Sequence, residues 1–301
     1  MLKKVGYFIT YILFLVFIGF FALLPFRVAY LFSDFLYVIL FYITGYRKKV
    51  AYTNIRKSFP NKTEQEIQKI LKQFYHHLGD LIVEGIKGFS MTRKQVIKRH
   101  KILNPEVLQS FTKNNQSTIC TTAHYNNWEW GTMSGTLQME GKAMALYMPL
   151  SNPYIDKLMK KIRASRGTEL ISIFKTLHAF RDRKDETYSY LLAADQNPPN
   201  ARFAYWMTFL NQETACINGP EKYARMFDYP VLFLNITKVK RGYYQIFIEV
   251  ITDNPSSSKK GDITVKYMRL LEKEINNNPQ YWLWSHRRWK KTRPENKELL
   301  D

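Results

Sequence analysis

The chain has 301 residues, enough for one large domain or for one domain with an appendage. Its formal net charge is +20, which predicts an acidic partner such as nucleic acid, an anionic membrane surface or an acidic carrier protein. Two distant cysteines, Cys120 and Cys216, do not form a disulfide framework, and no CxxC, HExxH or histidine cluster occurs. The sequence therefore predicts a reducing compartment and no metal site.

The N-terminal segment is uncharged from Val5 to Phe26, and its 22 residues would reach roughly 33 Å as a helix. That length crosses a bilayer core. A cleaved signal peptide would have a shorter apolar run followed by a small-residue cleavage site, which is missing here. A second apolar run, Val28–Thr44, contains Ser33 and Asp34. It could complete a membrane hairpin, but a buried charge favours an interfacial or core helix.

Basic residues flank the first apolar run unequally. Two precede it, Lys3 and Lys4, and six follow it, namely Arg27, Arg47, Lys48, Lys49, Arg56 and Lys57. The larger count predicts that the C-terminal bulk stays in the cytoplasm. We therefore expect a membrane anchor over residues 1–45 and a cytoplasmic domain over residues 46–301, in which the basic segment Tyr46–Asn54 leaves the membrane.

The first long helix of the domain is predicted over Thr63–Phe89. Thr63 and Glu66 have the spacing of a capping box. The apolar residues that follow recur at helical spacing and should pack on a core: Ile67, Ile70, Leu71, Phe74, Leu78, Leu81 and Ile82.

Strand-like and helical runs then alternate to residue 276. The predicted strands are Thr118–Thr122, Ala143–Met148, Leu170–Ile173, Tyr188–Ala194, Val231–Val239 and Tyr243–Thr252. The predicted helices are Tyr154–Ser165, Lys175–Arg183, Gly219–Phe227 and Asp262–Asn276. The last two strands form an antiparallel pair turned at Arg241-Gly242. The alternation predicts an α/β fold, with a mixed, mostly parallel sheet covered by helices.

The stretch Ser117–Gly131 joins the first of these strands to a segment that opens with His124 and carries Glu129 five positions later. Ligands of open α/β sheets gather at the carboxyl edge of the strands, and a helix start there favours an anion or a developing oxyanion. Glu129 lies close enough in sequence to hydrogen-bond the imidazole and stabilise its protonated form. The pattern indicates acyl transfer to a hydroxyl, although H-x4-E also occurs by chance around structural histidines.

Two further groups accompany this motif. Arg166, in a basic turn before Gly167, could hold a phosphate, or could simply end a helix. Asp195 and Gln196 follow the strand predicted to end at Ala194, at the same sheet edge as His124. The carboxylate could pair with Arg166, position a substrate or belong to a plain turn.

The closing segment, residues 279–293 (PQYWLWSHRRWKKTR), interleaves aromatic and basic side chains. Such a pattern binds single-stranded nucleic acid by stacking, or forms a membrane-interface belt. The predicted anchor favours the membrane and argues against nucleic acid.

Taken together, the chain resembles the late acyltransferases of lipid A biosynthesis, the lauroyl and myristoyl transferases of the lysophospholipid acyltransferase superfamily. The features that carry the resemblance occur in family order across almost the whole chain. They are the N-terminal apolar helix, Tyr46-Arg47 with Asn54, His124 with Glu129, Arg166-Gly167, Asp195-Gln196, and the W-x-H-R-R-W-K of the closing segment. Typical members read close to G-H-F-G-N-W-E where this chain has A-H-Y-N-N-W-E. Tyr125 and Asn126 are therefore expected to reshape the pocket, which bears on the identity of the acceptor more than on the reaction.

The resemblance implies a glycerolipid acyltransferase-like fold and a catalytic pair, His124 as general base and Glu129 orienting it. Substrate binding is expected from Asn127, Arg166, Asp195, Gln196, Arg287 and Arg288. It also implies an acyl carrier protein or acyl-CoA donor, a glycolipid acceptor in lipopolysaccharide biosynthesis, the bacterial inner membrane as location, and no cofactor or metal. Two alternatives stay open: an acyltransferase on another lipid, such as a phosphatidylinositol mannoside, an aminolipid or a lysophospholipid, and a non-catalytic module that binds the membrane surface.

Overall fold

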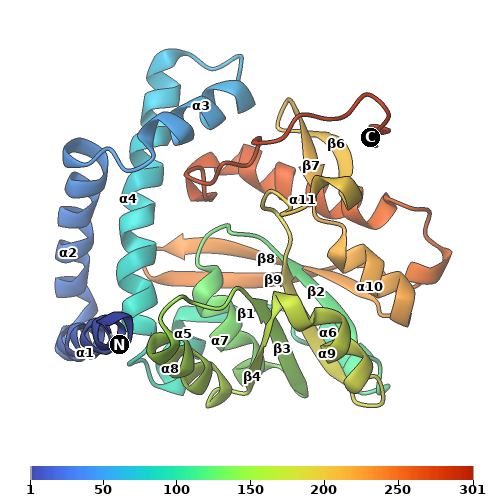
Figure 1. Cartoon of the computed structure of the whole chain (residues 1–301), viewed down its shortest axis with the longest axis horizontal. Helices are drawn as coiled ribbons and strands as arrows, with labels where there is room; N and C mark the ends of the chain where they lie inside the picture. Colours follow the sequence, from blue (N-terminus) through green and yellow to red (C-terminus); the bar gives the residue numbers. More distant parts are fainter. Residues whose placement is uncertain (1, 301) are drawn as a thin grey trace.

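The computed structural model describes residues 2–300, which form a seven-stranded sheet with helices on both faces and an N-terminal helical layer at one end (Figure 1). The strands lie in the order β1-β9-β8-β2-β5-β3-β4. Their bounds are β1 His100–Ile102, β2 Thr118–Thr122, β3 Lys142–Tyr147, β4 Thr168–Ser172, β5 Tyr188–Ala193, β8 Val231–Lys240 and β9 Tyr243–Thr252. Within this sheet, as the structure describes it, β8 and β9 pair in the antiparallel sense and all other pairs are parallel, so the predicted mixed, mostly parallel sheet is confirmed.

The β8–β9 hairpin turns at Arg241-Gly242, as predicted, and Gly242 supplies a φ of +74°. A second hairpin, β6 (Tyr205–Phe209) with β7 (Gln212–Cys216), forms a separate two-stranded sheet. It was not predicted. Its turn residues, Leu210 and Asn211, both have positive φ without a glycine, so the usual sequence signal for such a turn is missing.

Neighbouring residues of the central strands point to opposite faces of the sheet. Ile119 joins one hydrophobic cluster and Cys120 the other. The first cluster is covered by α9 (Thr176–Asp182), α10 (Gly219–Phe227), α11 (Asp262–Asn277) and parts of α3 (Lys48–Ser58) and α4 (Glu64–Gly88). The second is covered by α5 (Arg93–Arg99), α6 (Glu106–Thr112) and α7 (Trp128–Gln138). α8 (Pro153–Ala164) packs beside β4. Short 3₁₀ turns occur at Ile173–Lys175, Ala201–Phe203, Pro255–Ser257 and Pro279–Tyr281.

Helix α4 carries the capping box expected from Thr63 and Glu66. The predicted apolar stripe is buried from Ile67 to Leu78, but it then shifts: Ile82 is 40% exposed, and Val83 is buried in its place. The shift follows from the neighbours of this helix, because its C-terminal half packs against the N-terminal helices as well as the sheet domain. The basic segment Tyr46–Asn54, read as a connection, belongs largely to α3.

The N-terminal layer consists of α1 (Leu2–Leu23), α2 (Phe26–Val38) and a π-helical turn, Ile39–Ile43. By length and composition, Lys3–Leu23 and Phe26–Ile43 are both candidate membrane spans. α2 runs along α4, and Tyr30, Ser33 and Asp34 of α2 contact the domain. Ser33 is fully buried and donates to Asp80 Oδ1 over 2.7 Å. A Cβ on Gly79 would lie 2.8 Å from the carbonyl oxygen of Ser33, so a glycine is needed for this close packing.

Candidate active site

The loop between β2 and α7, residues 123–127 (the His124 loop), has the strand-to-helix form that the sequence predicted. Asn126 has a φ of +54°, and Asn127 caps α7 by accepting a 2.9 Å hydrogen bond from the Trp130 backbone N–H. The cap leaves other N–H groups of the first turn of α7 pointing towards the loop, and they give this edge of the sheet a positive potential.

His124 pairs with Asp195. Their strands, β2 and β5, are parallel neighbours, so the residues that follow them meet at one edge. His124 Nδ1 lies 2.7 Å from Asp195 Oδ1, and Trp282 Nε1 donates to Asp195 Oδ2 over 2.9 Å. The His124 side chain is 22% exposed, whereas the Asp195 side chain is 1% exposed. The imidazole is therefore reachable from outside, and the carboxylate is fixed from behind.

The charges around His124 favour the protonated imidazole. Burial lowers the pKa of His124, but the Asp195 carboxylate and its hydrogen bond, with a further contribution from Glu129, raise it above the usual 6.5. Burial in turn raises the pKa of Asp195, but its contacts with His124 and Trp282 lower it below 3.8 overall. A neutral His124 can thus accept a proton at one nitrogen while Asp195 balances the charge at the other.

The hydrogen bond expected between His124 and Glu129 does not form. Glu129 instead makes an ion pair with Arg163 of α8, and its own side chain is 43% exposed. The ring of Trp128 packs edge to face on His124, with 5.0 Å between the ring centroids. Glu129 therefore acts on His124 through its charge, while Asp195 and Trp128 set the position of the ring.

The closing segment is largely internal. Trp284 is fully buried, and Arg288 is 1% exposed and donates over 2.6 Å both to Thr214 Oγ1 and to the Ala215 carbonyl. Arg287, its neighbour, is exposed. The segment also fixes the His124 loop, because the His124 carbonyl accepts from the Leu283 N–H over 3.1 Å. The sequence pattern predicted a binding surface over the whole segment. In the structure, only some of its residues are exposed.

Arg47 and Asn54, which the sequence singled out beside Tyr46, contact the closing segment. Asn54 Nδ2 donates to the carbonyls of Trp284 and His286, both over 2.9 Å, and Arg47 donates to the Ser285 carbonyl over 3.3 Å. Helix α3 therefore holds the closing segment in position beside Asp195. Nothing in the local sequence of α3 revealed these partners, which lie more than 200 residues away.

The remaining predicted substrate-binding residues divide in two. Gln196 is half-buried and directly follows Asp195, so it lies at the site. Arg166 is not brought to His124: it is buried, and it donates to the carbonyls of Gly88 and Met91 over 2.8 and 3.0 Å. Asn127 is 1% exposed and uses both polar groups of its side chain inside the protein, one for the helix cap and one for Glu84.

Sequence reasoning missed the His124–Asp195 pair and Arg163. The His124–Asp195 pair could have been predicted, because each residue lies within two positions of the end of a predicted strand. Arg163 was missed because the nearby Arg166, next to Gly167, has a sequence context more typical of a ligand-binding residue. Among residues 2–300, no group of three or more His, Cys, Asp or Glu side chains is placed to hold a metal ion.

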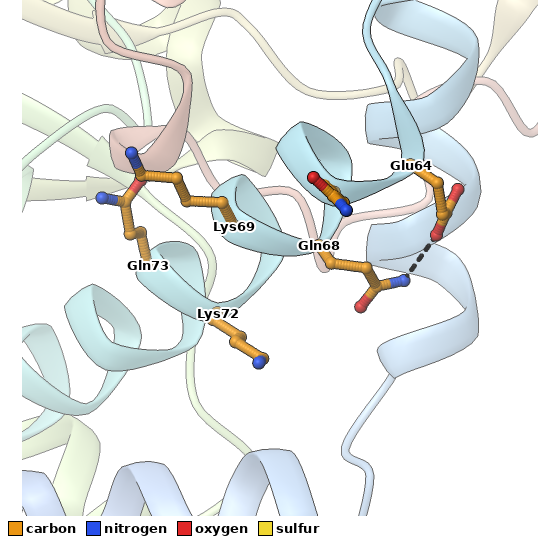
Figure 2. A pocket seen from close by; sticks show the side chains of 6 residues that line it. Glu64, Gln68, Lys69, Lys72 and Gln73 are labelled. Atoms are coloured by element: carbon orange, nitrogen blue, oxygen red, sulfur yellow. Dashed lines mark hydrogen bonds between the residues drawn. The ribbon is translucent and has the colours of Figure 1, made fainter.

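A surface depression on α4 lies apart from this site. Figure 2 shows its lining, Glu64, Gln68, Lys69, Lys72 and Gln73, with Gln68 donating to Glu64 over 2.8 Å. None of the residues gathered around His124 lines it. Its walls are long polar side chains of a single helix, which makes it a surface groove and a poor receptor for an acyl chain.

Comparisons with known proteins identify the family of the chain. The family model described as bacterial lipid A biosynthesis acyltransferase matches residues 1–291. The lipid A biosynthesis lauroyltransferase of Escherichia coli (strain K12) is 24% identical over 258 residues, which cover 83% of this chain and 80% of that protein. The palmitoleoyltransferase of the same strain is 22% identical (84% and 82% covered), and a lipid A biosynthesis acyltransferase of Haemophilus influenzae is 23% identical (83% and 79%). The chain thus belongs to the bacterial lipid A biosynthesis acyltransferase family, and the protein is an acyltransferase.

Proposed function

We propose that this acyltransferase moves a fatty acyl chain from a thioester, acyl carrier protein or acyl-CoA, to a hydroxyl group of a lipid A precursor. The observation that carries the proposal is the 2.7 Å contact between His124 Nδ1 and Asp195, because it orients the other ring nitrogen for proton transfer. The relatives named in lipid A biosynthesis support the class of acceptor.

In the proposed reaction, His124 Nε2 takes the proton of the acceptor hydroxyl as its oxygen attacks the thioester carbonyl. Asp195 keeps the proton on Nδ1 and balances the imidazolium charge. When the tetrahedral intermediate collapses, the carbon–sulfur bond breaks, and the proton on Nε2 passes to the leaving thiolate. The products are an ester and a free thiol, so one proton and one acyl group are transferred in balance.

The oxyanion needs donors near His124. The backbone N–H groups at the start of α7 and the guanidinium of Arg163, held by Glu129, are the candidates that the local geometry supports. Arg166 is not such a donor, because its guanidinium donates to the carbonyls of Gly88 and Met91. For substrate contacts we propose Gln196 and Arg287, which keep some exposure, while Asn127, Arg166 and Arg288 maintain the fold around the site.

In a direct test, the purified protein is incubated with a lipid A precursor and with either acyl carrier protein or CoA that carries a labelled acyl chain. The products are followed by mass spectrometry. The proposal expects a precursor heavier by one acyl group with the parent protein, and none with His124→Ala. Acylation of a lysophospholipid or an aminolipid alone would show that the acceptor is another lipid. Comparison of the two donors identifies the thioester used.

We also propose that residues 1–45 anchor the protein in the inner membrane and that residues 46–301 face the cytoplasm. The two candidate spans and the excess of basic residues after the first support this orientation. Because Cys120 and Cys216 are both buried, a cysteine introduced at exposed Lys260 gives a clean topology probe. In spheroplasts, an impermeant maleimide should label this cysteine only after the cells are opened. Labelling of intact spheroplasts would indicate the opposite orientation.

The anchor is not expected to be a detachable unit. Lys87 Nζ is buried against the end of α1, where it donates over 2.8 Å to the carbonyls of Phe21 and Leu24. Deletion of residues 1–27 would leave this ammonium without those acceptors. We therefore expect much of the truncated protein to leave the membrane fraction and to melt at a lower temperature than the full chain. Stable retention in the membrane would show that the remainder of the second candidate span, Phe26–Ile43, is a sufficient anchor.

A further inference from the structure

Glu84 of α4 is a fully buried carboxylate at which three other elements of the fold meet. Tyr30 of α2 donates to Oε1 over 2.7 Å. Asn127, the cap of α7, and Tyr244 of β9 each donate to Oε2, also over 2.7 Å. The main-chain carbonyl of Glu84 accepts from Trp130 Nε1 over 2.9 Å, so both its backbone and its side chain hold the start of α7.

This arrangement costs stability and therefore needs a reason. Burial, with a smaller contribution from the Asp80 charge, raises the pKa of Glu84 to about 7, although the hydrogen bonds from Tyr244 and Tyr30 act against the rise. An apolar side chain in place of Glu84 would leave the hydroxyls of Tyr30 and Tyr244 without their acceptor, which lowers stability. It would also leave the amide of Asn127 without an acceptor, and this second loss is the one that reaches the His124 loop.

The amide of Asn127 has two tasks that fix it in one orientation. Its oxygen accepts from Trp130 N–H to cap α7, and its nitrogen donates to Glu84. With both ends bound, the amide cannot flip, and the backbone of Asn127 is held between β2 and α7. The left-handed Asn126 precedes it, and His124 lies two residues further back in the same loop. A shift of Asn127 would therefore move His124 relative to Asp195, which follows β5 and is also held by Trp282.

We propose that Glu84 is a positioning residue for His124, acting through Asn127, and that Tyr30 extends the same network to helix α2, a candidate membrane segment. The proposal rests on the proposed function only in taking His124 as the base. It goes further in linking a candidate membrane segment to the geometry of the site through a single carboxylate.

The test uses the full-length protein and a set of matched variants. Glu84→Gln keeps an acceptor for Asn127 and should retain most of kcat. Glu84→Leu and Asn127→Ala remove the contact, and each should lower kcat at least tenfold with KM within about twofold, because positioning acts on the transition state. The double variant should be no slower than the slower single variant. Tyr244→Phe removes a donor from the same oxygen without touching the loop. It should lower the melting temperature and leave kcat within about twofold.

A hydrogen-bond swap covers the case in which Glu84→Leu does not fold. Asn127→Asp keeps the helix cap but sets two carboxylates against each other, so it should be slow. Adding Glu84→Gln restores a donor–acceptor pair in the reversed direction, and kcat should recover by at least fivefold. Failure of the swap to restore kcat, or an equal loss of kcat in Tyr244→Phe, would overturn the positioning role.

A readout without substrate separates this inference from the proposed reaction. The rate at which diethyl pyrocarbonate modifies His124, followed by mass spectrometry across pH, reports the pKa of its imidazole. Glu84→Leu should lower that pKa towards the value found in Asp195→Asn, and Tyr244→Phe should leave it at the parent value. If the pKa shifts as expected while the parent acylates no lipid A precursor, only the proposed acceptor fails. An unchanged pKa in Glu84→Leu contradicts the positioning role itself.

Discussion

The His124 loop with the first turn of α7, and the closing segment, carry similar residues, histidine, tryptophan and charged side chains, but they are used in different ways. In the loop, His124 keeps 22% of its side chain exposed, and its partner Asp195 is buried behind it. In the closing segment, Arg288 is 1% exposed and binds the β6–β7 hairpin, while Arg287 beside it is exposed. This difference indicates that the partners supplied by neighbouring strands determine whether a charged side chain can contact a substrate or instead stabilises the fold.

The sharpest test of this contrast is His124→Ala. A general base contributes about 10²–10⁴-fold to the rate, so kcat should fall by that order. The melting temperature should fall only modestly: buried Asp195 loses its imidazole partner, but Trp282 still donates to it, and the loop's main-chain contacts stay intact. Turnover near the parental rate in a folded protein would remove His124 from the chemistry.

The reverse pattern is expected at Arg288. Arg288→Leu leaves the Ala215 carbonyl and the Thr214 hydroxyl without their donor, at about 1–3 kcal/mol for each buried group left unpaired. The melting temperature should fall clearly, and the fraction that stays folded should turn over at a near-normal rate. Arg287→Leu is the matched control for stability: it should leave the melting temperature and kcat unchanged, and any effect should appear in KM alone. A stable Arg288→Leu protein with a raised KM would mean that Arg288 contacts substrate after all.

An intermediate effect is expected for the Glu129–Arg163 pair. Glu129→Gln removes one of the charges that raise the pKa of His124 and releases Arg163. We expect kcat to fall about tenfold, less than in His124→Ala, because the Asp195 carboxylate still stabilises the imidazolium. If the pair works as a unit, Glu129→Gln with Arg163→Gln should be no slower than the slower single variant. Additive losses would indicate two separate roles.

The smallest effect concerns the exposed cations of the closing segment. Arg287→Gln with Lys290→Gln should raise KM for the donor or acceptor about two- to threefold at low salt, because exposed charges act through a field screened over about 8–10 Å. kcat should be unchanged, since a uniform binding contact appears in KM. The difference should vanish in 0.5 M salt. A KM difference that persists there would show a direct contact with substrate.

Much of the fold was predictable because it follows from local patterns. The limits of β9 and α10, and the turn at Gly242, match the prediction, as does the capping box at Thr63. The β6–β7 hairpin was not predictable, since its turn lacks glycine. α3 was missed because few of its residues are apolar and its key contacts are with the closing segment.

The site was predictable only in part. His124 stands out from the strand-to-helix pattern alone, but its pairing with Asp195 depends on which strand becomes the neighbour of β2, and 71 residues separate the two side chains. Local spacing pointed to Glu129 in its place, since Glu129 is near in sequence. The burial of Arg166 and Arg288 is likewise set by tertiary partners, which residue type and spacing do not reveal.

The most direct test of the central claim is the pH dependence of kcat/KM in the parent and in Asp195→Asn. Asp195 stabilises the imidazolium and raises the pKa of His124 above 6.5, and only neutral His124 can act as base, so parental activity should rise with pH through that raised pKa. Without the carboxylate, burial dominates: the acidic limb should move below that of the parent, and the plateau should fall. An acidic limb that stays in place in Asp195→Asn, but moves in Glu129→Gln, would contradict the account and restore Glu129 as the partner of His124.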